Sequence, residues 1–122
     1  MAVNNETGKN GEAVACAYLK TSGYTILHTN WRYHRYELDI VATQGQELVV
    51  VEVKTRSTNP LVAPERAINA PKIARIAAAA EAYVCRYNMD LPVRFDVICL
   101  INNGHSCTVT EHIEDAFFAP LK

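Results

Sequence analysis

The side chains best placed to do chemistry belong to two consecutive apolar runs, ELDIVAT and ELVVVEVKT, joined by a short segment that contains Gly45. Two such runs around a short glycine-containing turn predict a β-hairpin. Because side chains alternate between the faces of a strand, Glu37 and Asp39 share one face of the first run, and Glu52 and Lys54 share one face of the second. The hairpin therefore carries ionisable groups on one face, at the end away from its turn.

Whether Asp39 meets Glu52 depends on the length of the turn. A two-residue loop at Gln44 and Gly45 sets Glu37 opposite Glu52, with Asp39 on the diagonal, whereas a four-residue loop sets Asp39 directly opposite Glu52. Either even-numbered loop leaves the carboxylates within about 4.5–8 Å, and at about 5 Å two such charges repel by roughly 3 kcal/mol at an effective dielectric constant near 20. A divalent cation with oxygen ligands would offset this repulsion. The alternative is a solvated strand end with an ordinary Glu–Lys ion pair.

Length and composition fit one folded domain, residues 1–122, with 49% hydrophobic and 20% charged residues. No apolar run reaches the roughly 20 residues that span a membrane, and no signal peptide is apparent, so we expect a cytoplasmic protein without membrane contact. The four cysteines lie in apolar segments and form no C-x-x-C pair, which favours buried, reduced thiols. Because the net charge is −1, any contact with nucleic acid must come from a local patch.

The periodicity of apolar residues predicts the element order α-β-β-β-α-β-β: helices over residues 7–22 and 72–87, and strands over residues 24–33, 37–43, 47–55, 92–101 and 105–113. Gly23 should end the first helix and Pro71 should open the second. Helices able to cover both faces of a mixed five-stranded sheet predict an α/β sandwich. Glu12 lies on the apolar side of the first helix, where it either points at the sheet or complements the helix dipole.

Several smaller expectations concern individual residues and connecting segments of the predicted fold. Ile26 and His28 should share one face of the first strand. Residues 56–63 should form a polar loop, followed by a short helical turn at Pro64. Asp96 is expected to be a structural partner of Arg94, and the two phenylalanines of the tail, residues 117 and 118, should dock on the core.

Two groups of residues are candidates for contact with nucleic acid. In the cluster WRYHRY, aromatic rings suit stacking on bases and arginines suit phosphates, but Trp31 at the core edge with Arg32 in water fits the pattern equally well. At the start of the second helix, Lys72 and the helix amides suit a phosphate, and the alternative is an ordinary solvated face.

The order of the charged residues also carries a resemblance. Glu12 on a helix, then Asp39, then Glu52-Val53-Lys54 resemble the PD-(D/E)xK nuclease superfamily, whose restriction-endonuclease-like core is an α-β-β-β-α-β unit. More narrowly, the motifs GEAVACAYL, NWR, ELDIVA, VVVEVKTR and RFDV, with the helical lysine at 72, resemble the YraN-like family of predicted endonucleases, which is related to archaeal Holliday-junction resolvases. The similarity spans nearly the whole chain, with one departure: Tyr36 stands where that family usually has glycine.

The resemblance implies a metal-dependent endonuclease that hydrolyses phosphodiester bonds of nucleic acid, chiefly DNA and with branched DNA among its substrates. It implies a site in which Mg²⁺ or Mn²⁺ is bound by Asp39, Glu52 and the backbone carbonyl of Val53, with Glu12 holding a water of the metal or a second metal, and Lys54 orienting the attacking water. The residues implied to contact the nucleic acid are Arg32, Arg56 and Lys72, with Glu37 and Trp31 as secondary candidates. A homodimer is also implied.

Two other functions fit the same sequence. In the first, the nuclease fold persists but only binds branched or single-stranded nucleic acid. In the second, the domain binds other proteins and its acids form a structural ion network. Binding of a fork without cutting under any divalent metal would indicate the first function, and no binding at low salt would indicate the second.

Overall fold

The computed structural model describes residues 3–58 and 68–119, with side-chain detail from residue 10 onward. The elements follow the predicted order α-β-β-β-α-β-β, with these bounds: α1 Val3–Thr21, β1 Thr25–Tyr33, β2 Tyr36–Gln44, β3 Glu47–Ser57, α2 Ala70–Tyr87, β4 Val93–Asn102 and β5 Cys107–Phe117. The predicted loop does not begin at residue 56, because β3 continues alongside β4 as far as Ser57. The predicted turn at Pro64 lies outside the described residues.

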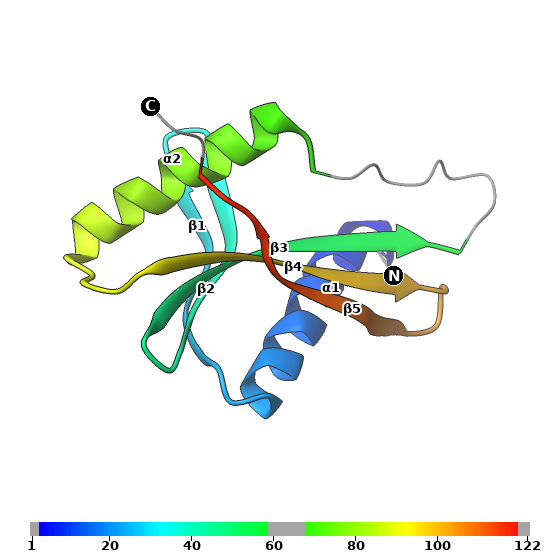
Figure 1. The fold of residues 1–122 in the computed structure, drawn as a ribbon. Helices are drawn as coiled ribbons and strands as arrows, with labels where there is room; N and C mark the ends of the chain where they lie inside the picture. The colour runs from blue at the N-terminus through cyan, green and yellow to red at the C-terminus, as the bar shows by residue number, and fades with distance from the viewer. Residues whose placement is uncertain (1–2, 59–67, 120–122) are drawn as a thin grey trace.

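The five strands form one mixed sheet in the order β1-β2-β3-β4-β5. Strands β3 and β4 are parallel because α2 connects them, and the other neighbours are antiparallel. Helix α1 lies on one side of the sheet and α2 on the other (Figure 1). The predicted α/β sandwich is therefore confirmed. Among the described residues, neither helix is long and apolar enough to cross a membrane.

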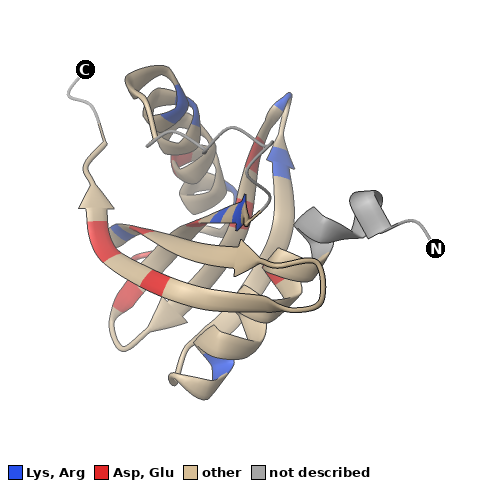
Figure 2. Ribbon diagram, turned by 90° about the vertical axis from the view of Figure 1, so that its right-hand side faces the viewer, with Lys and Arg blue, Asp and Glu red and all other residues tan. Residues whose placement is uncertain are grey.

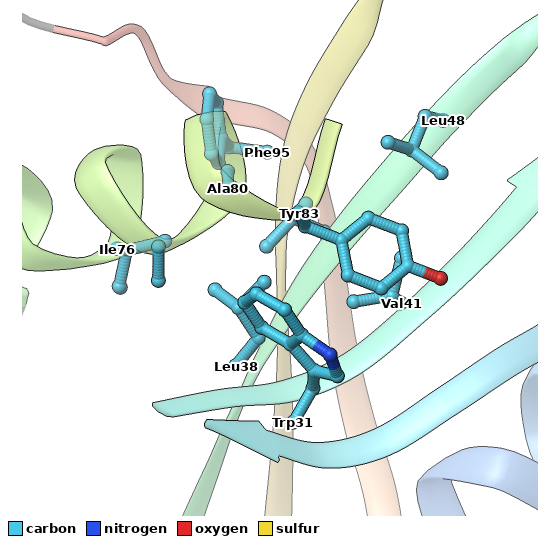
Figure 3. Packing of buried hydrophobic residues seen from close by; sticks show 10 residues of the cluster. Trp31, Leu38, Val41, Leu48, Ile76, Ala80, Tyr83 and Phe95 are labelled. Carbon is cyan, nitrogen blue, oxygen red and sulfur yellow. The ribbon is translucent and has the colours of Figure 1, made fainter. Parts of the chain in front are cut away.

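Capping residues define both ends of helix α2. The side chain of Asn69 accepts a hydrogen bond of 2.9 Å from the backbone N–H of Lys72, and Pro71 occupies the first turn. Asn88 ends the helix in a left-handed conformation with φ +51°. The buried stripe of α2 packs against Trp31 and other apolar residues of the sheet, as Figure 3 shows for Ile76, Ala80 and Tyr83.

Helix α1 is held close to the sheet at both of its described ends. Gly23, with φ +94°, follows the helix, and the backbone N–H of Tyr24 donates to the carbonyl of Leu19. Near the other end, Gly11 is buried, and a Cβ at this position would overlap the hydroxyl of Thr55 on β3. Only glycine allows this approach, which brings the neighbouring Glu12 to the sheet.

A buried polar network fixes β4 and β5. Arg94 donates to both carboxylate oxygens of Asp96 at 2.9 and 2.8 Å, so the predicted pairing is confirmed. His112 Nε2 lies 2.7 Å from Asp96 Oδ2, and His112 Nδ1 lies 2.9 Å from the hydroxyl of Tyr18 on α1. Burial alone would raise the pKa of Asp96, but the hydrogen bonds from Arg94, His112 and the N–H of Asp115 lower it. The network thus ties α1, β4 and β5 together through one fully buried carboxylate.

Four local expectations are wrong. A bulge in β1 lies between Ile26 and His28, so Ile26 packs on the α1 side while His28 hydrogen-bonds Tyr83 on the α2 side. Strand β5 extends to Phe117 rather than ending at residue 113. Phe117 stacks on Phe95 with ring centroids 5.1 Å apart, but Phe118 is 76% exposed and does not dock on the core. The four cysteines are free thiols, as expected, but the burial that their apolar sequence surroundings predicted is wrong: Cys85 is exposed, and the other three are half-buried.

Candidate metal centre

The two strands of the predicted hairpin separate where the acids lie. The β2–β3 ladder runs from Gln44 opposite Glu47 to Ile40 opposite Val51, and one further step in this register sets Asp39 opposite Glu52. This is the register expected from a four-residue loop. However, Gln44 and Glu47 also pair, so the turn itself contains only two residues, Gly45 and Gln46, with Gly45 at φ +57°.

Beyond the last β2–β3 pair, the side chain of Asp39 rather than its backbone accepts a hydrogen bond from β3. Its Oδ2 accepts a hydrogen bond of 2.8 Å from the backbone N–H of Val53, which lies just past the last regular β2–β3 pair. Side-chain alternation along β2 breaks at Asp39, because Leu38 and Val41 both pack on the α2 side whereas Ile40 packs on the α1 side. The carboxylate of Asp39 contacts both the backbone of Val53 and the side chain of Glu52.

Asp39 and Glu52 form a buried carboxylate pair. Glu52 is only 5% exposed, and the side chains of the two acids share a hydrogen bond. Burial, together with the charge of Glu52, raises the pKa of Asp39 from 3.8 to about 8, although the N–H of Val53 acts in the opposite direction. Two acids in this arrangement hold a proton between them unless positive charge is supplied.

Two lysines supply part of that charge to the same oxygen. The Nζ of Lys72, on the first turn of α2, lies 2.7 Å from Oε2 of Glu52, and the Nζ of Lys54 lies 3.9 Å from it. The side chain of Lys72 is 42% exposed, whereas that of Lys54 is 14% exposed. Lys54 is therefore built into the site, while Lys72 reaches it from the surface.

Glu12 lies near this pair without joining it. Burial raises the pKa of Glu12, the side chain of Asn30 lowers it through a hydrogen bond, and the charges of Glu37 and Glu52 raise it further. Within the described residues, no group of three or more His, Cys, Asp or Glu side chains is close enough together to hold a metal ion. The structure thus brings Asp39 and Glu52 together and leaves Glu12 at their margin.

A polar cavity of about 190 Å³ opens beside the carboxylate pair. Asp39, Glu52 and Glu37 line it together with Lys72, and its other walls come from Arg35, Tyr36, Arg75 and Ile76. Acids of β2 and β3 therefore face basic residues of the β1–β2 turn and of α2. Figure 2 shows the Lys and Arg residues of α2 and of that turn in one view.

Three of the predicted contact residues, Arg32, Arg56 and Trp31, do not line this cavity. Arg32 is exposed and forms an ion pair of 3.3 Å with Glu37. Arg56 is exposed on β3, two residues beyond Lys54. Trp31 is only 9% exposed, and its Nε1 donates to the hydroxyl of Tyr87, so it packs in the core and presents little surface for a base.

The donor set fits a small hard cation. Two carboxylates and the backbone carbonyl of Val53 offer oxygen ligands, and Mg²⁺ is usually held by one or two carboxylates while it keeps several waters. Burial, and then the charge of Glu52, raises the pKa of Asp39, so the charged form of this acid needs a neighbouring cation to offset its lost hydration. Two carboxylates are enough for such a cation, so Glu12 is needed only for a water in its coordination shell.

Sequence reasoning missed the role of Asn30 and the place of two arginines. The NWR motif contained Asn30, whose φ of +51° is unusual for a residue other than glycine, but its hydrogen bond to Glu12 depends on how α1 meets β1. Arg35 belonged to the basic cluster WRYHRY and Arg75 lay near the start of the second helix, but their spacing along the chain gave no signal that both line this cavity.

Comparisons with known proteins agree on one family. Residues 11–100 match the model of the Uncharacterised protein family UPF0102. A UPF0102 protein of Parabacteroides distasonis is 54% identical over 122 residues, which is the full length of both chains. UPF0102 proteins of Bacteroides thetaiotaomicron and Porphyromonas gingivalis are 50% and 49% identical, over 99% and 100% of this chain and 99% and 91% of their own lengths. With a paired carboxylate centre on a five-stranded mixed sheet, this chain belongs to the UPF0102 family, the YraN-like group that its motifs resemble.

Proposed function

We propose that this protein is a metal-dependent endonuclease of the PD-(D/E)xK type, which hydrolyses phosphodiester bonds of DNA in the cytoplasm. One observation carries the proposal: the carboxylates of Asp39 and Glu52 are buried together beside Lys54, at the point where β2 and β3 separate. Lys54 and Lys72 lie beside this pair, yet burial, and then the charge of Glu52, still raises the pKa of Asp39 to about 8. A bound divalent cation would favour the charged form of both acids.

A divalent cation, Mg²⁺ or Mn²⁺, would supply Lewis acidity toward the scissile phosphate. Asp39, Glu52 and the carbonyl of Val53 would hold it, and Glu12 would fix a water of its shell. Because Asp39 is itself anchored to the N–H of Val53 at 2.8 Å, its other oxygen is presented in one orientation. The ligands on the two strands are therefore positioned before any substrate arrives.

Lys54 is the residue best placed to act on the substrate. Its ammonium group lies 3.9 Å from Glu52, and its side chain is mostly buried. At this position it would orient the attacking water and stabilise the negative charge that develops on the phosphorus oxygens. Arg56, Arg32 and Lys72 surround this centre and would contact the flanking phosphates.

Cleavage assays test the proposal directly. Linear, single-stranded, forked and four-way DNA, with matching RNA, are incubated with Mg²⁺ or Mn²⁺ and resolved on denaturing gels. We expect cleavage by the wild-type protein and a loss on the order of 10²- to 10³-fold or more for Asp39→Asn, Glu52→Gln and Lys54→Ala. Matched controls are Glu81→Gln and Lys20→Ala, which change exposed residues of α2 and α1.

The same panel distinguishes the alternatives. Undiminished cleavage in purified Asp39→Asn and Lys54→Ala would remove this centre as the active site. Binding of forked DNA without cleavage under any metal would instead indicate a nucleic-acid-binding protein with the nuclease fold. Absence of binding at low salt would indicate a protein-interaction module. Analytical ultracentrifugation on the same samples tests the homodimer that belongs to the proposal.

A further inference from the structure

A second cavity lies next to the metal centre, on the same side of the sheet. Helix α2 packs chiefly over β1 and β2, and beyond it a cavity of about 290 Å³ opens over β3, β4 and β5 (Figure 1). Its apolar walls include Ile73 of α2, Val97 of β4, and Ile113 and Phe117 of β5. None of the interactions that build the metal centre requires this space.

Lys54 connects the two cavities. Its side chain lines the second cavity, and its Nζ lies 3.9 Å from Glu52 in the metal centre. The first turn of α2 lies between them, with Lys72 lining the polar cavity and Ile73 lining the second cavity. Two residues along a strand span about 7 Å, so the second cavity begins one side chain beyond Glu52.

The lining of the second cavity combines apolar walls with groups of both charges. Lys54 and Arg56 of β3 line the cavity, with Lys54 the nearer of the two to Glu52 along the strand, and Glu111 of β5 also lines it. An aliphatic side chain of a partner protein would match the apolar walls but would make no polar contact with Arg56 or Glu111. A nucleobase attached to the phosphate backbone uses both the walls and the charges, because its ring fits apolar walls, its phosphates meet the cations, and its amino group donates to the carboxylate.

We infer that this cavity binds one unpaired nucleobase, carried by the nucleotide next to the phosphate that is cut. The inference rests on the proposed nuclease function and specifies its substrate class: a nucleic acid with an unpaired nucleotide beside the cleavage point, as in a single strand, a bulge or a branch. A continuous duplex cannot place a base there without first unstacking it. Glu111 favours bases that present an amino group, which are cytosine, adenine and guanine, over thymine and uracil.

Binding measured in EDTA tests this inference without cleavage. Fluorescein-labelled duplexes carrying one bulged cytosine, the same bulge without its base, or no bulge are titrated with protein at low salt, and anisotropy gives Kd. For wild-type protein we expect the bulged cytosine to bind about tenfold more tightly than the abasic bulge or the paired duplex. Ile113→Trp fills the cavity, and we expect this variant to bind all three duplexes equally, which gives a Kd ratio of about one.

Ile101→Trp is the matched control. Ile101 and Ile113 are exposed isoleucines on neighbouring strands, with 36% and 38% exposure, but Ile101 does not line the cavity. This control should retain the tenfold ratio. If Ile113→Trp fails to fold by circular dichroism, Ile113→Glu against Ile101→Glu repeats the comparison with a charge that repels the phosphates.

Failure of the base pocket and failure of the nuclease give different results. A ratio near one in wild-type protein, or the same loss in both tryptophan variants, would overturn the base pocket even if cleavage is observed. If wild-type protein binds the bulged cytosine tenfold more tightly than the controls, and only Ile113→Trp abolishes this preference, the result would support the pocket even if no metal permits cleavage.

Discussion

Replacing Lys72 with methionine should tighten the binding of divalent cations. The Nζ of Lys72 lies 2.7 Å from Oε2 of Glu52, an oxygen that a metal ion in this centre would take. The cation must displace the lysine from that oxygen, so the lysine competes with it. The structure therefore predicts that losing a positive charge improves metal binding, but only because this lysine occupies a ligand atom.

The size of the effect follows from the geometry. At 2.7 Å and an effective dielectric constant near 20, the direct attraction between Lys72 and Glu52 is about 6 kcal/mol. Hydration of a lysine that is 42% exposed, and the loss of its side-chain freedom, offset most of this, which leaves about 1–2 kcal/mol. The corresponding change is about 5- to 30-fold in the Kd for Mn²⁺.

Isothermal titration of Mn²⁺ into the DNA-free protein measures this change. Lys20→Met is the control, because it removes an exposed lysine of α1 away from the centre, and it should leave Kd within about twofold of wild type. Metal-free Lys72→Met should also lose about 1–2 kcal/mol of unfolding free energy, and saturating Mn²⁺ should remove this difference. Weaker Mn²⁺ binding in Lys72→Met would refute the reasoning, since it would mean that the lysine helps to hold the metal's shell.

Three further predictions concern stability. Because the pKa of Asp39 is about 8 in the folded protein and 3.8 in the reference state, the metal-free fold binds an extra proton between these values, so its unfolding free energy should fall as pH rises from about 4 to about 8. Asp39→Asn should flatten this slope in urea titrations at a series of pH values, and an unchanged slope would contradict the assignment. Asp96→Asn should lower the unfolding free energy by about 3 kcal/mol, because it removes the fully buried acid from Arg94 and leaves only the more exposed Glu47 and Glu114 as its ion-pair partners; a loss below about 1 kcal/mol in urea unfolding would argue against a structural role for the pair. Gly11→Ala should cost about 1–3 kcal/mol through the contact with Thr55, and a double-mutant cycle with Thr55→Ala should recover part of that loss.

The parts of the site that lie close together in sequence could be predicted. Strand alternation and an even-numbered turn are local properties, and they placed Asp39 opposite Glu52 in one of the two registers considered. The end of α1 at Gly23 and the start of α2 near Pro71 followed from backbone preferences of single residues. These features depend on little beyond a few neighbouring residues.

Other features depend on how separate elements meet. The contact of Lys72 with Glu52 requires the approach of α2 to β3, so the sequence suggested only a phosphate contact for this lysine. The bulge at Ile26 reverses which residues of β1 face α2, and alternation alone cannot reveal an inserted residue. Phe118 looked like core because it is apolar, but the sheet ends at Phe117 and leaves it exposed.

The hydrogen bond from Val53 to Asp39 has a consequence for how this lineage could change over time. Asp39 accepts from the backbone of β3, so this side chain has a structural role that would remain without any metal or catalysis. A descendant that lacked the proposed chemistry would still require an acceptor at this position, and asparagine would be the smallest departure available. Under the proposed nuclease function, loss of activity would therefore appear first at Glu52 or Lys54, and an intact aspartate at position 39 would be poor evidence that a relative cleaves DNA.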